Sequence, residues 1–169
     1  MGIIRCTAKM LKELGVKPTD ELGQSVSIGN WHANLLLIDR RKCVLFTNDQ
    51  TLYSLFVPAL KKPQFEIFPE VFRLNLYKGL MSEGFSERQI ECLFNEHRQI
   101  KIAKSNNRSV LGSMNDLAAN IKCSVDMRGG LDKADLNDLN HELNRIPMGA
   151  IQYKSSIVEL KRRLDEIET

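Results

Sequence analysis

Residues 106–116, NNRSVLGSMND, carry the clearest combination of side chains for binding chemistry. The segment joins an expected strand end to an expected helix start, where unpaired backbone N–H groups and the positive end of the helix dipole favour a negatively charged ligand. A guanidinium adds a two-pronged donor, and a neighbouring hydroxyl adds another hydrogen bond. The predicted anion-binding residues are Asn106, Asn107, Arg108, Ser109 and Ser113. The alternative interpretation is that they only shape the loop and cap the helix.

A second basic group stands at residues 40–42, between two apolar stretches that are expected to form a β-hairpin. Arg40, Arg41 and Lys42 at a hairpin tip resemble a finger that contacts nucleic-acid phosphates. Lys61 and Lys62 would extend this basic patch. Charge at a hairpin tip also improves solubility, which is the alternative interpretation.

The same hairpin offers a candidate catalytic pair. We expect Ile38 to lie opposite Cys43, which places His32 opposite Asp49 on one face of the two strands. A carboxylate in that position would fix the tautomer of the imidazole and raise its pKa, as a general base or a phosphate-binding histidine requires. Ser109 is the third catalytic candidate, since its hydroxyl stands at the anion-binding helix start. The alternative is a surface histidine at a strand end with no catalytic role.

Common metal and cofactor chemistries lack their signatures in this chain. The 4 cysteines are far apart in the sequence. No pair therefore has the spacing of about two to four residues from which zinc and redox sites are built. No P-loop, Gly-rich dinucleotide turn, HExxH or Gly-x-Ser-x-Gly segment occurs. We therefore expect neither a metal nor a cofactor.

Hydrophobic periodicity and turn signals predict the elements that would position these side chains. Expected strands cover residues 3–6, 31–38, 43–48, 51–57 and 99–104, and expected helices cover 8–14, 69–84, 87–94 and 109–123, with a loop over 18–30. The stretch 51–57 could instead begin a helix. Ser86 and Gln89 form a capping box, and Val110, Met114 and Leu117 begin the buried stripe of the helix over 109–123.

These elements predict an α+β fold over residues 1–128. We expect a mainly antiparallel sheet of three to five strands, covered by helices on one face, because strands that alternate polar and apolar residues bury only one side. A hinge at residues 128–130 leads to a C-terminal extension over residues 129–169. This extension is expected to hold two helices, over 133–144 and 156–167.

Length and charge limit the function classes. A chain of 169 residues fits one domain with a short appendage. It carries 24 Lys and Arg against 21 Asp and Glu, with the excess of cations in residues 1–128 and an acidic balance in residues 129–169. This permits a polyanionic partner without requiring one. No apolar stretch is long enough for a bilayer, and residues 1–15 are charged where a signal peptide is apolar, so we expect a cytoplasmic protein.

Three segments together carry a family resemblance. They are IIRCTAKMLKELG at residues 3–15, WHANLLLIDRRKCVLFTNDQTLYSLFVPALKKP at 31–63, and KSNNRSVLGSMNDLA at 104–118. With them the chain resembles a bacterial family of small proteins classed as a domain of unknown function. The family implies no activity, cofactor or substrate. Its members look like proteins met on plasmids and among mobile-element genes, which implies a nucleic-acid-linked or defence-related role.

Three functions from different classes follow from these patterns. The first is a binding module for an anionic partner, RNA, DNA or a phosphate-bearing ligand, which would use the two basic groups. The second is a small metal-independent hydrolase or ribonuclease, which would use His32 or the start of the helix at Ser109. The third is a protein-interaction module that docks a partner through its C-terminal helices.

Overall fold

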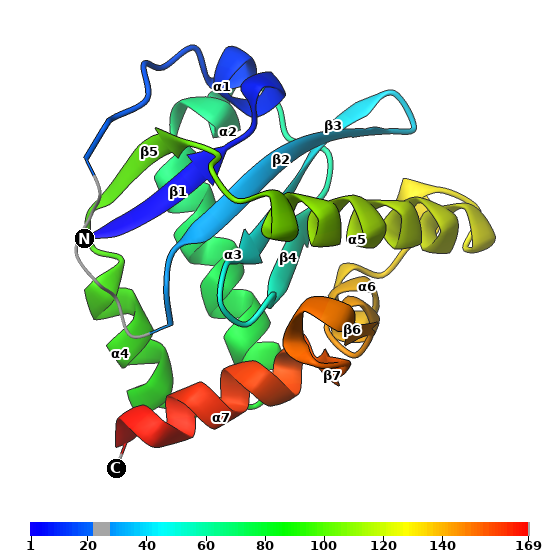
Figure 1. Ribbon diagram of the computed structural model, residues 1–169. Helices are drawn as coiled ribbons and strands as arrows, with labels where there is room; N and C mark the ends of the chain where they lie inside the picture. The colour runs from blue at the N-terminus through cyan, green and yellow to red at the C-terminus, as the bar shows by residue number, and fades with distance from the viewer. Residues whose placement is uncertain (22–27, 169) are drawn as a thin grey trace.

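The computed structural model describes residues 1–21 and 28–168, so the loop expected over 18–30 lies partly outside the described residues. Five strands form one sheet in the order β4-β3-β2-β1-β5 (Figure 1). The strands are β1 (Gly2–Cys6), β2 (Trp31–Ile38), β3 (Arg41–Asn48), β4 (Ser54–Val57) and β5 (Ile100–Lys104). The α+β class and the predicted number of strands are confirmed.

The sheet combines an antiparallel meander with two parallel pairings. β1 lies between β2 and β5 and runs parallel to both of them, whereas β2, β3 and β4 form an antiparallel meander. Parallel neighbours need a crossover connection, and each connection here contains helices. No local signal in the short first strand indicates its interior position between two parallel neighbours.

The β2–β3 hairpin has a tighter turn than the sequence predicted. Asp39 and Arg40 form a two-residue turn, with φ of 51° and 62°, so Ile38 pairs with Arg41 and not with Cys43. Positive φ at both central positions is what a two-residue hairpin turn requires. The expected pairing is therefore wrong by two residues. A shift of two leaves each side chain on its predicted face, because side chains alternate with a period of two.

Helices on one face of the sheet enclose the larger of two apolar cores. They are α1 (Ala8–Leu14), α2 (Lys62–Glu66), α3 (Phe68–Ser82), α4 (Glu87–Glu96) and α7 (Ser156–Glu168). Trp31, Phe46 and Phe72 meet edge to face or tilted at the centre of this core. Helix α2 was not predicted. It lies between the expected strand over 51–57 and the expected helix over 69–84, and Pro63 suits its first turn because no N–H is needed there.

The opposite face of the sheet is also covered, which corrects the expectation of helices on one face only. Helix α5 (Arg108–Met127) crosses in front of the sheet in Figure 1, and α6 (Leu136–Leu143) follows after the short helix η1 (Leu131–Lys133). Leu36, Cys43 and Leu45 on this face pack against α5 and α6. The prediction gave weight to the polar residues at one end of β2. Most of this face is apolar, however, and must be buried.

Local signals explain where the predicted helices begin. The side chains of Thr7, Ser86 and Asn107 accept hydrogen bonds from the backbone N–H groups of Met10, Gln89 and Val110, respectively. Helix α6 is shorter than predicted because Asp135 caps it from outside. After α6, a small hairpin of β6 (Pro147–Met148) and β7 (Lys154–Ser155), with the short helix η2 (Gly149–Ile151) between them, returns the chain to α7.

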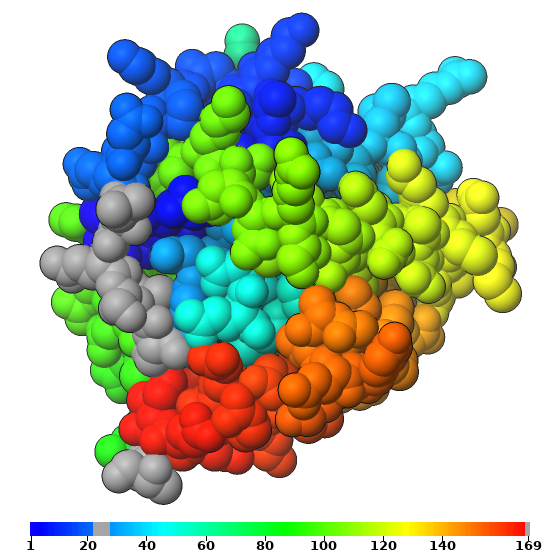
Figure 2. Space-filling view, viewed as in Figure 1, coloured from blue at the N-terminus to red at the C-terminus, as the bar shows by residue number. Residues whose placement is uncertain are grey.

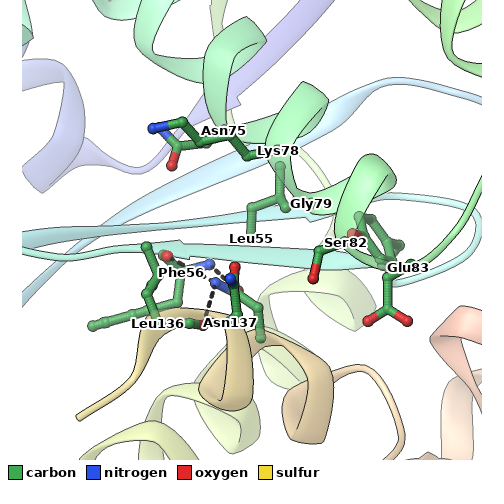
Figure 3. A pocket seen from close by; sticks show the side chains of 11 residues that line it. Leu55, Phe56, Asn75, Lys78, Gly79, Ser82, Glu83, Leu136 and Asn137 are labelled. Atoms are coloured by element: carbon green, nitrogen blue, oxygen red, sulfur yellow. Dashed lines mark hydrogen bonds between the residues drawn. The ribbon is translucent and has the colours of Figure 1, made fainter.

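Two asparagines, Asn140 of α6 and Asn144 directly after its end, cover the outer edge of β4. Asn144 accepts a hydrogen bond from the Ser54 N–H at 2.7 Å and donates one to the Ser54 carbonyl at 2.8 Å. Asn140 accepts from the Phe56 N–H at 2.7 Å and donates to the Phe56 carbonyl at 3.2 Å. Figure 3 shows α6 beside the Leu55–Phe56 stretch, with α3 approaching from the other side. The amides thus replace a neighbouring strand and close this sheet edge.

Candidate anion-binding site

The tip of the β2–β3 hairpin borders an open hollow of about 580 Å³. The residues that line this hollow, called the tip hollow below, are Arg40, Arg41, Lys42, Ala59, Leu60 and Lys61. None of these residues is acidic. The Leu60 N–H donates to the Lys42 carbonyl at 2.8 Å and so ties the 59–61 segment to the hairpin. The sequence indicated that Lys61 would extend the basic group, and the structure brings it to the tip.

Two ion pairs fix the tip on opposite sides. The Arg41 guanidinium binds both carboxylate oxygens of Asp132, at 2.7 and 3.1 Å, and the Lys42 ammonium lies 2.7 Å from Glu13 on α1. The hydrogen bond from Arg41 also holds the pKa of Asp132 below its usual value. Arg40 and Lys61 are exposed, and neither makes an ion pair with a described residue. The tip therefore keeps uncompensated positive charge.

The start of α5 keeps a free guanidinium but only part of its predicted donor set. Asn106, Asn107, Arg108 and Ser109 are all exposed, and among the described residues Arg108 has no ion pair. The side chain of Asn107 already accepts from the Val110 N–H at 3.1 Å, so one amide of the helix start is satisfied within the chain. Ser113, by contrast, is buried.

The two basic groups do not converge. The tip docks beyond the end of α5, where Asp39 accepts from the Leu131 N–H at 2.8 Å and Arg41 binds Asp132. Arg108 stands at the beginning of the same helix, which has 20 residues. A helix of that length spans about 30 Å. In Figure 2 the tip side chains project at the same end of the molecule as the last turns of α5. The hairpin tip and the start of α5 at Arg108 therefore form two separate surfaces.

The candidate catalytic histidine, His32, is buried between polar residues of the two neighbouring strands. His32 pairs with Thr47 rather than with Asp49, and on its other side it pairs with Arg5 of β1. His32 is only 1% exposed. Neither nitrogen of its ring has a hydrogen-bond partner among the described residues. Burial, reinforced by the Arg5 charge, lowers the pKa of His32 to about 4. The ring is therefore neutral near pH 7, the opposite of the expected raised pKa.

Asp49 lies just past the end of β3. Its Oδ1 atom is buried without a hydrogen bond, and it lies against Gly29, where an added Cβ would approach it to 2.4 Å. Burial raises the pKa of Asp49 to about 6, although Arg5 acts in the opposite direction. The Arg5 charge thus acts on both His32 and Asp49, and it lowers the pKa of each. Sequence reasoning missed it, because only the parallel pairing of β1 and β2, distant in the chain, places it there.

The described residues form neither a metal-binding cluster nor a membrane-spanning helix. No group of three or more His, Cys, Asp and Glu side chains that could hold a metal ion occurs in residues 1–21 and 28–168. Over the same part of the chain, no helix combines the length and the apolar character needed to cross a bilayer.

The fold and the site together define a small α+β protein whose mixed sheet presents a basic, fixed hairpin tip. The chain belongs to the family described as "Domain of unknown function (DUF6933)", which it matches over residues 3–159. This confirms the resemblance to a family of unknown function. No curated protein and no solved structure matches the chain.

Proposed function

We propose that this protein binds nucleic acid through the phosphate backbone at the tip hollow. The observation that carries the proposal is the lining, in which four of the six side chains are cationic and none is acidic. Guanidinium and ammonium groups are the donors that phosphodiester oxygens accept from most strongly. Arg41 engages Asp132 with one hydrogen from each terminal nitrogen, so its remaining N–H groups stay available for a phosphate.

The surrounding surface extends this positive charge. Lys9 and Lys12 of α1 are exposed and lie within about one helical turn of Glu13, the partner of Lys42. Lys62 follows Lys61 and is also exposed. The tip hollow has no aromatic or amide side chain with which to stack on a base or read its edge. We therefore infer backbone contacts with little sequence preference.

The test is a salt titration with a labelled mixed-sequence RNA 20-mer and the corresponding duplex DNA, followed by fluorescence anisotropy. Phosphate contacts release counterions, so log Kd is expected to rise linearly with log salt, with a slope of about 0.7–0.9 per contacted phosphate. A salt-independent Kd, or no binding at low salt, contradicts the proposal. A nucleoside triphosphate in the same assay distinguishes a small phosphate ligand, because only such a site would be saturated by the mononucleotide at comparable concentration.

Matched variants locate the site. Arg40→Ala and Lys61→Ala remove cations that hold no described ion pair, so we expect the fold to persist while affinity drops and the salt slope falls by about one for each lost contact. Lys122→Ala, on an exposed position of α5, is the control and is expected to leave affinity unchanged. Arg108→Ala separates the two basic surfaces. If it weakens binding as much as Arg40→Ala does, the tip hollow is not the principal site.

A further inference from the structure

A stripe of apolar side chains runs along the outward side of α3. Phe68, Phe72, Leu76 and Leu80 point into the core. Ile67, just before the helix, and Leu74, Tyr77 and Met81 within it are each about half exposed. Their spacing of seven, three and four residues places them on one helical face. Scattered exposed apolar residues are ordinary, but an aligned set of this length is typical of an interaction surface.

Helix α4 turns the lower part of this stripe into a groove. Tyr77 of α3 and Phe94 of α4 meet edge to face, with ring centroids 6.0 Å apart. The residues that line the groove, called the α3–α4 groove below, are Tyr77, Met81, Glu87, Ile90, Glu91 and Phe94, around a volume of about 340 Å³. A thioether and aromatic rings form an adaptable apolar floor of the kind that receives a partner's side chains.

The charge at the α3–α4 groove is entirely negative. Glu87 and Glu91 are the only charged residues that line it, both are exposed, and neither makes an ion pair with a described residue. They stand four residues apart on one helix, where like charges repel each other. By contrast, an arginine or a lysine forms an ion pair with each of Glu13, Glu70, Glu83 and Glu159. The two free carboxylates thus provide complementarity to a cationic partner.

We propose that the α3–α4 groove docks an amphipathic helix of a partner protein, with leucine-like anchors on one face and lysine or arginine beside them. The stripe from Ile67 to Met81 covers 14 residue steps, about 21 Å of helix, which matches roughly four turns of a bound helix. The carboxylates disfavour an anionic membrane surface, because they would repel its headgroups. This proposal is independent of nucleic-acid binding, which uses the opposite charge on other elements.

The probe is a designed 18-residue peptide of Leu, Lys and Ala, with leucines along one helical face, labelled and followed by fluorescence anisotropy. We expect saturable 1:1 binding. Tyr77→Ala and Met81→Ala shorten exposed side chains and are expected to weaken binding roughly five- to tenfold. Met127→Ala, which changes an equally apolar residue that is 83% exposed on α5, is the control and leaves affinity unchanged.

A charge-reversed pair makes the test specific. Glu87→Lys combined with Glu91→Lys is expected to transfer preference to the same peptide with Glu in place of Lys, whereas Asp116→Lys on α5 leaves the preference unchanged. If neither the apolar variants nor the charge variants change the affinity for the peptide, the proposal is overturned. Sedimentation that shows a dimer lost in Tyr77→Ala also overturns it, and assigns the groove to a second copy. Groove-dependent binding to neutral lipid vesicles without peptide binding overturns it as well.

Discussion

His32 and Asp49 respond to acid in opposite directions, because burial favours the neutral form of each, which is the deprotonated form of His32 and the protonated form of Asp49. The pKa of His32 falls from 6.5 to about 4 on folding, so its contribution to stability is complete above pH 6.5 and is lost as pH falls toward 4. The pKa of Asp49 rises from 3.8 to about 6, so its contribution is complete below 3.8 and is lost as pH rises toward 6. Between these limits the two effects oppose each other.

We predict that His32→Leu changes the pH dependence of stability. Leucine cannot be protonated, so the variant escapes the penalty that the wild-type protein incurs in acid. The free energy of unfolding of the variant, relative to wild type, is expected to increase by about 2 kcal/mol between pH 7 and pH 4.5. Urea denaturation at several pH values measures it. A difference that stays constant with pH would show that the imidazole of His32 has the same pKa in the folded and unfolded states, which contradicts the prediction.

Gly29 provides a second prediction for a single residue. Gly29 and Gly84 both have φ of 82°, but an added Cβ at Gly29 would lie 2.4 Å from Asp49 Oδ1, whereas nothing lies within 4 Å at Gly84. We expect Gly84→Ala to cost about 1 kcal/mol from backbone strain alone. Gly29→Ala is expected to cost about 2–3 kcal/mol, because the strain and the clash add. Chemical denaturation compares them, and equal costs would mean that the side chains of Asp49 and Gln50, which both lie against this position, move aside freely.

Among the secondary-structure elements, the successful predictions relied on signals within a few residues. The capping box at Ser86 and the buried stripe that begins with Val110, Met114 and Leu117 are decided by neighbouring residues, so the sequence predicts this helix start and this buried face. The position of β1 between β2 and β5 and the partners of His32 depend on residues far apart in the chain, and no local pattern encodes them. The sequence predicted the cations of the tip hollow, because they are nearly consecutive in the chain. It did not predict that Arg108 lies on a different surface from them.

The edge contacts of α6 give a prediction for one element. Asn144→Ala leaves the backbone N–H and carbonyl of Ser54 buried without these partners. We expect a loss of about 2–4 kcal/mol in the free energy of unfolding, and faster hydrogen exchange of the Ser54 amide. Asn137→Ala, an exposed position on the same helix, is expected to stay within about 0.5 kcal/mol of wild type. Similar effects of the two substitutions would argue against the edge role of Asn144.

For the whole molecule, residues beyond 128 contribute to both cores. Leu139 and Leu143 of α6 pack with α5 on one face, whereas Leu160 and Leu164 of α7 pack with α3 and α4 on the other. Burial of each such side chain contributes about 1.5–3 kcal/mol, and together they rival the whole net stability of about 5–15 kcal/mol for a domain.

We therefore predict that a chain ending at Arg128 lacks a cooperative unfolding transition. A chain that ends at Asp165 keeps all four of these leucines and is the matched control. Thermal unfolding followed by circular dichroism distinguishes them. A sharp transition in the shorter chain would show that residues 1–128 fold alone, and would allow the C-terminal helices to serve chiefly for docking a partner.

The closed borders of the sheet restrict how another molecule can join it. The amides of Asn140 and Asn144 occupy the outer groups of Ser54 and Phe56, and at the far side the Thr19 N–H donates to the Ile102 carbonyl at 2.8 Å. An extended peptide that approached either border would have to displace bonds that the chain already makes to itself. Recognition by strand addition, and the fibrous self-association that begins in the same way, is thereby discouraged at both ends of the sheet.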